Sequence, residues 1–321
     1  MKKVFLVVVY GITFSVSAQR ISNTALYRDV QSPTYFRIHY ENDYFSGTDI
    51  YYTQGINFEY VNPSIENFFI SKLLVRTTSK ETKFGIALEH EGYTPTSILS
   101  PAILTGDRPF AACLFLNAFS IVNDSARSAR ISSAVSAGVI GPMAGGKEMQ
   151  ESIHHWINAK QPQGWQNQIQ NDIILNYQME YERGLLHYKN YFLLLAKAGA
   201  RAGTLNTKAY GGAIFMAGYF DDPFKNFVTQ KRKTQTYVYA EPLLTLVGHD
   251  ATLQGGLFNN SNPYVIPSLA VSRMVYQLNI GLIIRLNRLQ FEYFQSFLSK
   301  EFETGHKHVW GGVRISWYAG K

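Results

Sequence analysis

NDIILNYQMEYER, residues 171–183, decides the fold because its side chains alternate between two chemical kinds. One face carries large apolar side chains, namely Ile173, Leu175, Tyr177, Met179 and Tyr181. The other face carries polar ones, namely Asn176, Gln178, Glu180 and Glu182. Alternation with a period of two indicates a β-strand whose two faces meet different surroundings. SRMVYQLNIGLIIR, residues 272–285, repeats the pattern.

Two settings suit such strands: a soluble sandwich of two sheets and a barrel whose apolar face meets lipid. The runs are long, and their apolar faces are rich in Tyr and Leu, which favours the membrane barrel. The sequence has 21 Tyr, 21 Phe and a single cysteine, Cys113, so no intrachain disulfide can form. A closed sheet whose backbone pairs with itself can be stable without one.

We predict twelve strands of the length that tilted membrane strands need. They are 35–43, 51–61, 82–92, 109–121, 131–140, 171–183, 187–200, 206–219, 235–247, 271–284, 287–298 and 307–318. An even number closes the sheet and leaves no edge. The predicted fold class is therefore all-β, a twelve-stranded antiparallel transmembrane barrel. Residues 141–168 do not alternate, and the helical spacing from Lys147 to Asn158 predicts a short helix in an extracellular loop.

The first residues predict export. Lys2 and Lys3 precede a short apolar core, and small residues end it, so we expect a signal peptide over 1–18, cleaved after Ala18. Residues 19–321 then form a single barrel domain. The mature chain has no run of 18 apolar residues, which leaves no candidate transmembrane helix. The net charge of +7 could reflect solubility alone. Since export makes nucleic acid an unsuitable partner, we interpret the charge as suited to an anionic lipid surface.

Polar residues crowd into ENDYFSGTDIYYTQG, residues 41–55, between the first two predicted strands. Asn and Asp at a hairpin end are commonly turn formers. However, successive strands run in opposite directions, so this loop, the loop 93–109 and the loop that holds the helix must lie at one rim. Gln150 and His154 are four residues apart and share a face of that helix. A carboxylate, an amide, a hydroxyl and an imidazole near a lipid surface could hydrolyse an ester.

The same segments resemble a known family, the lipid A 3'-O-deacylases of the outer membrane. ENDYFSGTDIYYTQG is similar to the family's N-D…T-D-x-Y-Y-T-x-G signature. GVIGPMAGGKEMQESIHHWINAKQPQGWQNQIQND is similar to its second signature, G-x-x-G-P-x-A-x-G-x-x-x-Q-x-x-x-H followed by G-W-x-x-Q. GDRPFAA is a third, weaker match. The matches span about residues 35 to 185, in the family's order and spacing.

The resemblance implies a twelve-stranded barrel that removes the 3'-linked acyloxyacyl group of lipid A and depends on calcium. It implies catalytic roles for Asn42, Asp43, Thr53 and His154, with His155 as the alternative histidine. Lipopolysaccharide is the implied substrate, acted on from the extracellular leaflet by a monomer. One departure concerns a functional lysine that the family's best-known members carry before G-D-R, because the loop SILSPAILTGDRP contains none. Arg108 is the nearest cation, and we expect it and Gln150 to bind substrate.

The expected chemistry uses water as the nucleophile, since no G-x-S-x-G elbow is present. A histidine is suited to act as a general base near neutral pH. Calcium takes oxygen ligands, and Asp43 with Asp49 could hold the ion, while Asn42 could donate to the carbonyl oxygen. Three alternatives stay open at this point: a phospholipase or other esterase of the outer leaflet, a porin, and a catalytically inactive relative.

Overall fold

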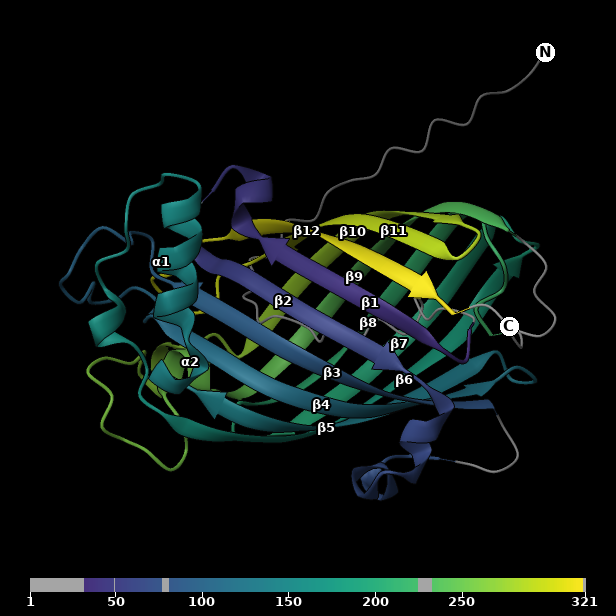
Figure 1. Ribbon diagram of the computed structural model, residues 1–321, viewed down its shortest axis with the longest axis horizontal. Helices are drawn as coiled ribbons and strands as arrows, with labels where there is room; N and C mark the ends of the chain where they lie inside the picture. The colour runs from purple at the N-terminus through teal and green to yellow at the C-terminus, as the bar shows by residue number, and fades with distance from the viewer. Residues whose placement is uncertain (1–31, 49, 77–80, 225–232, 320–321) are drawn as a thin grey trace, which may run out of the picture.

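The computed structural model describes residues 32–48, 50–76, 81–224 and 233–319, and within them twelve antiparallel strands close into a barrel (Figure 1). Each strand pairs with its neighbour in sequence, and β1 closes the barrel by pairing with β12. The predicted fold is therefore confirmed. The strands are β1 Tyr35–Asn42, β2 Tyr51–Val61, β3 Glu81–Thr94, β4 Ala111–Asp124, β5 Ala129–Ile140, β6 Asp172–Tyr188, β7 Phe192–Gly203, β8 Asn206–Tyr219, β9 Thr234–Asp250, β10 Met274–Leu286, β11 Leu289–Leu298 and β12 His308–Tyr318.

The predicted signal peptide, residues 1–18, lies outside the described residues. Among the residues that are described, no helix has both the length and the apolar character to cross a membrane.

Alternation along the strands separates an apolar outside from a polar inside. In β6, the outward-facing Ile173 is 55% exposed, whereas the inward-facing Glu182 is fully buried. Leu175, Met179 and Tyr181 are likewise exposed on the outer face. A soluble protein would bury these side chains, so this inverted arrangement is what a lipid-facing wall requires.

Buried ion pairs cross the barrel interior. The Lys197 ammonium lies 3.0 Å from a Glu241 oxygen and 3.1 Å from a Glu180 oxygen. Arg314 lies 2.7 Å from Glu292 and 3.4 Å from Glu41. Because Lys197 is on β7 and Glu241 on β9, the first group ties together strands that are not neighbours in the sheet. Each of these buried charges therefore has partners of opposite charge, which offsets part of the cost of removing it from water.

Most strand boundaries lie within three residues of the prediction, and the largest difference is between β6 and β7. We predicted a strand over 187–200, but β6 continues to Tyr188 and β7 begins at Phe192. The register of β6 against β7 shifts between Gly184 and Leu186. This irregularity interrupts the alternation and made the end of β6 look like a turn. The helix α1 occupies Gly146–Trp156, close to the predicted 147–158.

The two ends of the barrel carry different structures (Figure 1). One end carries α1 and the connections β1–β2, β3–β4 and β5–β6, as strand parity predicts. Its short helices are η2 (Asp43–Ser46), η5 (Pro142–Ala144), η6 (Trp165–Asn167), α2 (Ala251–Gln254) and η8 (Ser268–Ala270). The other end carries η3 (Pro63–Asn67), η4 (Phe69–Leu73) and the C-terminal end of β12.

Candidate active site

Thr53 owes its direction to a β-bulge. The pairing of β2 with β3 shifts between Tyr52 and Gln54, so Thr53 is the extra residue. A Cβ added to Gly92 would lie 3.3 Å from Thr53 Cγ2, so the Thr53 side chain lies beside Gly92. Gly92 is on the same face of β3 as the exposed Leu88. The bulge therefore directs Thr53 to the outer face of the wall, and bulges often re-aim side chains in this way beside active sites.

Asn42 and Asp43 shape the end of β1. Asn42 Oδ1 accepts a hydrogen bond from the Tyr44 backbone N–H at 2.7 Å and so caps η2. Its Nδ2 donates to the Thr53 carbonyl at 2.6 Å and to the Tyr40 hydroxyl at 3.2 Å. Asp43 is buried, and its Oδ2 accepts from the Ile50 N–H at 2.6 Å. The two residues therefore fix the turn and also tie β1 to the bulge in β2.

The helix α1 lies against the outer wall, and glycine permits the contact. A Cβ on Gly146 would come within 2.3 Å of the Ala112 Cβ on β4, so only glycine fits at this distance. One turn later, Gln150 is buried and its Nε2 donates to Thr53 Oγ1 at 3.3 Å. Trp165 Nε1 donates to Gln150 Oε1 at 2.7 Å. Gln150 is thus held from two sides, and the helix runs from β4 toward β2.

His154 follows Gly146 and Gln150 at four-residue spacing, so it continues the face that contacts the wall. Its Nδ1 lies 2.6 Å from the Lys160 carbonyl oxygen. This contact requires the Nδ1–H tautomer, or the doubly protonated ring, because a carbonyl can only accept. In the neutral tautomer, Nε2 is then the basic nitrogen.

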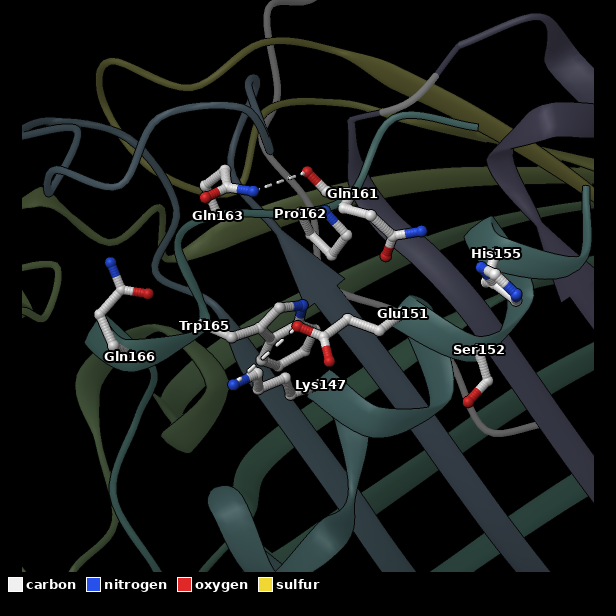
Figure 2. Close-up of a pocket in the computed structure, with 9 residues that line it drawn as sticks. All are labelled: Lys147, Glu151, Ser152, His155, Gln161, Pro162, Gln163, Trp165 and Gln166. Carbon is white, nitrogen blue, oxygen red and sulfur yellow. Dashed lines mark hydrogen bonds and ion pairs between the residues drawn. The ribbon is translucent and has the colours of Figure 1, made fainter. Parts of the chain in front are cut away.

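His155 faces a different space from His154. It lines an open pocket of about 580 Å³ between α1 and the segment after it. Figure 2 shows Lys147, Glu151 and His155 on α1 and Gln161 and Gln163 across the pocket. The pocket is thus lined mainly by polar and charged side chains, while His154 is not among them.

Arg108 lies apart from this group. Its guanidinium is buried, pairs with Glu301, donates to Thr252 Oγ1 at 2.6 Å and stacks 4.3 Å from the Tyr93 ring centre. Burial raises the pKa of Glu301 to about 7, although the positive charge of Arg108 acts in the opposite direction. These contacts give Arg108 a structural role in joining loops of the α1 end. Its predicted role in substrate binding stays a prediction.

Calcium takes oxygen ligands, and the end of β1 offers oxygen atoms. Asp43 contributes a carboxylate, and the Thr48 hydroxyl lies 3.4 Å from the Asp43 carbonyl oxygen. Asp49, the second predicted ligand, lies outside the described residues. In the part of the chain that is described, no three His, Cys, Asp or Glu side chains gather as a metal-binding group. The donor chemistry therefore fits calcium, but of the two predicted ligands only Asp43 has a described position.

The structure joins Asn42, Thr53 and Gln150 directly by hydrogen bonds and sets His154 one helical turn further along. Trp165 is a further member of this group, which the predicted site residues did not include, because its indole N–H holds Gln150 in place. Trp165 is 2% exposed, whereas Trp156 is 85% exposed. The spacing of Gln150 and Gly164-Trp165 within one signature was the available signal.

The chain is similar to a family of outer membrane proteins and to a solved barrel structure. A family model described as "Outer membrane protein LpxR" matches residues 4–319. Among solved structures, LpxR from Salmonella typhimurium is similar with a TM-score of 0.72 and 20% identity, over 89% of this chain and 100% of that one. The β domain of the Bordetella autotransporter BrkA matches with a TM-score of 0.49 and 7% identity, over 90% of this chain and 100% of that one.

No curated protein sequence matches the chain significantly. At 20% identity, the Salmonella structure supports the fold. The family model covers nearly the whole chain, and on that match the protein belongs to the LpxR family of outer membrane proteins.

Proposed function

We propose that the protein is a lipid A deacylase that hydrolyses the ester of the 3'-O-linked acyloxyacyl chain. The observation that carries the proposal is the hydrogen-bonded group of Asn42, Thr53 and Gln150 on the outer wall, under α1. This group lies on the outer face of the wall and not in the barrel interior, so we propose that lipid approaches it from the surrounding leaflet. Membership of the LpxR family supports the same substrate class.

His154 is the proposed general base. Its Nδ1–H donates to the Lys160 carbonyl, which leaves Nε2 to take a proton from water. The backbone contact also fixes the ring plane, which a positioned base requires. His155, on the pocket side of α1, is the matched residue for comparison.

Thr53 and Gln150 are proposed to position the attacking water. The Thr53 hydroxyl accepts from Gln150 and can donate its own hydrogen. Both amide hydrogens of Asn42 have acceptors, the Thr53 carbonyl and the Tyr40 hydroxyl. We therefore assign Asn42 to positioning of the bulge, instead of the donation to the ester oxygen that the sequence analysis considered.

In the proposed reaction, the water oxygen attacks the ester carbonyl carbon while its proton moves to His154 Nε2. The tetrahedral intermediate collapses, and the bond between the acyl carbon and the 3'-oxygen breaks. His154 returns the proton to the departing sugar oxygen. The products are a sugar hydroxyl and the free acyloxyacyl acid. Calcium, held by Asp43 and Asp49, would supply positive charge beside the ester oxygen.

The polar pocket beside α1 is the proposed binding site of the substrate headgroup. Lys147 is half exposed there and lies 3.9 Å from Glu151. It could supply the positive charge of the lysine that the loop 93–109 lacks, because Lys147 is half exposed whereas Arg108 is buried against Glu301. Phosphate or sugar oxygens could also accept hydrogen bonds from Gln161 and Gln163.

A phospholipase of the outer leaflet would use the same chemistry, so the substrate must be tested directly. A channel is less well supported, because Lys197 and Arg314 pair with carboxylates across the interior.

The test is mass spectrometry of lipid A and phospholipids from cells expressing the wild type, His154→Ala or His155→Ala, with and without a calcium chelator. We expect loss of an acyloxyacyl mass with the wild type and with His155→Ala, and none with His154→Ala or after chelation. An unchanged lipid A spectrum with correctly folded wild type would overturn the assignment of lipid A as the substrate. Shortened phospholipids instead would establish the phospholipase.

A further inference from the structure

The connection between β2 and β3 forms a compact structure on the outside of the barrel. We call residues 62–76 the outer hook. It contains η3 and η4 and lies at the end of the barrel opposite α1 (Figure 1). Asn62 caps η3 by accepting from the Ser64 N–H at 2.9 Å. The hook is therefore an ordered element with its own cap.

The hook covers hydroxyl groups that would otherwise face lipid. Ser120 on β4 and Ser133 on β5 pair across the strands and lie on the outer face, in step with the exposed Leu116. Ser120 Oγ donates to the Val75 carbonyl at 2.6 Å, and the Val75 N–H donates to Ser133 Oγ at 2.7 Å. Polar groups in lipid must find partners within the protein. The backbone at Val75 supplies them.

Apolar contacts and one more hydrogen bond hold the hook against the wall. Ile65 and Leu74 pack with Phe84 and Ala118 on the outer faces of β3 and β4. The Tyr177 hydroxyl on β6 donates to the Leu73 carbonyl at 3.2 Å. The hook thus spans the outer surface from β3 to β6.

The opposite side of the hook exposes apolar and basic side chains. Phe68, Phe69 and Leu73 are 51%, 77% and 53% exposed. Lys72 lies 5.7 Å from the centre of the Phe69 ring, and Arg76 is also exposed. Within residues 62–76 the acidic side chain is Glu66, so the segment has a net charge of +1, from two basic residues and one acidic residue.

We propose that the outer hook binds anionic phospholipid headgroups in the leaflet at the end of the barrel away from α1. The hook packs on the outer face that also bears the exposed Leu116 of β4 and Leu175 of β6, so we expect the same bilayer to meet both. Short helical segments with Phe and Leu on one side and Lys or Arg beside them lie in the membrane interface. The basic side chains are placed for lipid phosphates. The hook thereby fixes the depth of the barrel in the membrane.

The proposal can be tested with the full chain refolded into vesicles. Phe69→Cys is labelled with an environment-sensitive fluorophore, and Ala126→Cys, in the exposed β4–β5 turn at the same end, is the matched control. Cys113 is fully buried, and the wild type labelled in parallel gives the background. Quenching is measured with nitroxide-headgroup lipid in vesicles of phosphatidylethanolamine with phosphatidylglycerol, and in vesicles of phosphatidylcholine.

We expect the label at 69 to be quenched more strongly than the label at 126, and more in phosphatidylglycerol vesicles. Lys72→Gln with Arg76→Gln should reduce this lipid preference, by about fivefold for each basic side chain. Equal quenching at 69 and 126 would overturn the proposal. Strong quenching at position 69 that is equal in phosphatidylcholine vesicles and in phosphatidylglycerol vesicles would overturn the proposed preference for anionic headgroups. Neither readout depends on hydrolysis, so the proposed function can fail separately.

Discussion

The helix α1 and the outer hook both cover polar groups on the outside of the same wall, but they do so with different atoms. Under α1, the Thr53 hydroxyl meets the side-chain amide of Gln150. Under the hook, Ser120 and Ser133 meet the backbone of Val75. A side-chain partner can be replaced by substitution, whereas a backbone partner is present whatever residue stands at position 75. The contact under α1 therefore belongs to the candidate active site, whereas the contacts under the hook only cover polar groups.

The largest expected difference between the helix α1 and the outer hook is in catalysis. His154→Ala should lower the deacylation rate by about 10²–10⁴-fold, because it removes the proposed base. Rates are measured on purified, refolded protein with lipid A in mixed micelles. His155→Ala, which alters the proposed headgroup pocket, should raise KM and leave kcat near the wild-type value. Similar losses of kcat in the two variants would remove the assignment to His154.

The α1 end should also be the more sensitive to pH. Burial raises the pKa of Glu301 from 4.5 to about 7, so the folded state favours its protonated form. The stability that this group contributes is fully present below pH 4.5 and is lost as the pH rises through 7. The difference corresponds to about 3 kcal/mol in the free energy of unfolding.

Denaturant titrations between pH 4.5 and 8 would measure this effect. Glu301→Gln should flatten the pH dependence relative to the wild type. A wild-type barrel whose stability rises over this range in step with the variant would contradict the shifted pKa.

Gln150→Leu should cost about 2 kcal/mol of unfolding free energy, because the Trp165 N–H and the Thr53 hydroxyl lose a buried partner. Activity should fall as well, since Thr53 is no longer held. Gln161→Leu, at an exposed position beside the pocket, is the matched control for stability. Full activity in Gln150→Leu would show that the contact is structural.

The smallest expected effect is at the hook. Ser133→Ala should cost about 1 kcal/mol, because the Val75 N–H loses its acceptor. The cost should be the same at pH 5 and pH 7, and deacylation should be unchanged. Ser125→Ala, in an exposed turn, serves as the control. A drop in activity would mean that the two covers are coupled.

The strands could be predicted from the sequence because alternation is a local property, and the lipid-facing side chains of β6 display it directly. The short helix could also be predicted, from the helical spacing of its residues. The bulge at Thr53 could not, because it depends on the register between β2 and β3. The position of α1 on the outer wall was also beyond a local pattern, because the contact of Gly146 with Ala112 joins segments that are distant in sequence.

The position of Arg108 shows a second limit. The loop position of Arg108 suggested substrate binding, which stays a prediction, but it did not reveal the partner Glu301, which lies 193 residues away in sequence. No local pattern could reveal that pair. The outer hook was similarly hidden, because its contacts with Ser120 and Ser133 join distant segments and its own sequence resembles an ordinary connection.

The hydrogen bond between Thr53 and Gln150 on the outside of the wall also bears on how the proposed enzyme would meet its substrate. The protein and its lipid substrate would meet by diffusion in two dimensions within the leaflet. The ion-paired interior of the barrel would serve only as a rigid support. A compound that plugs the mouth of the barrel would leave turnover unchanged. An effective inhibitor would first have to partition into the bilayer and then approach from the side.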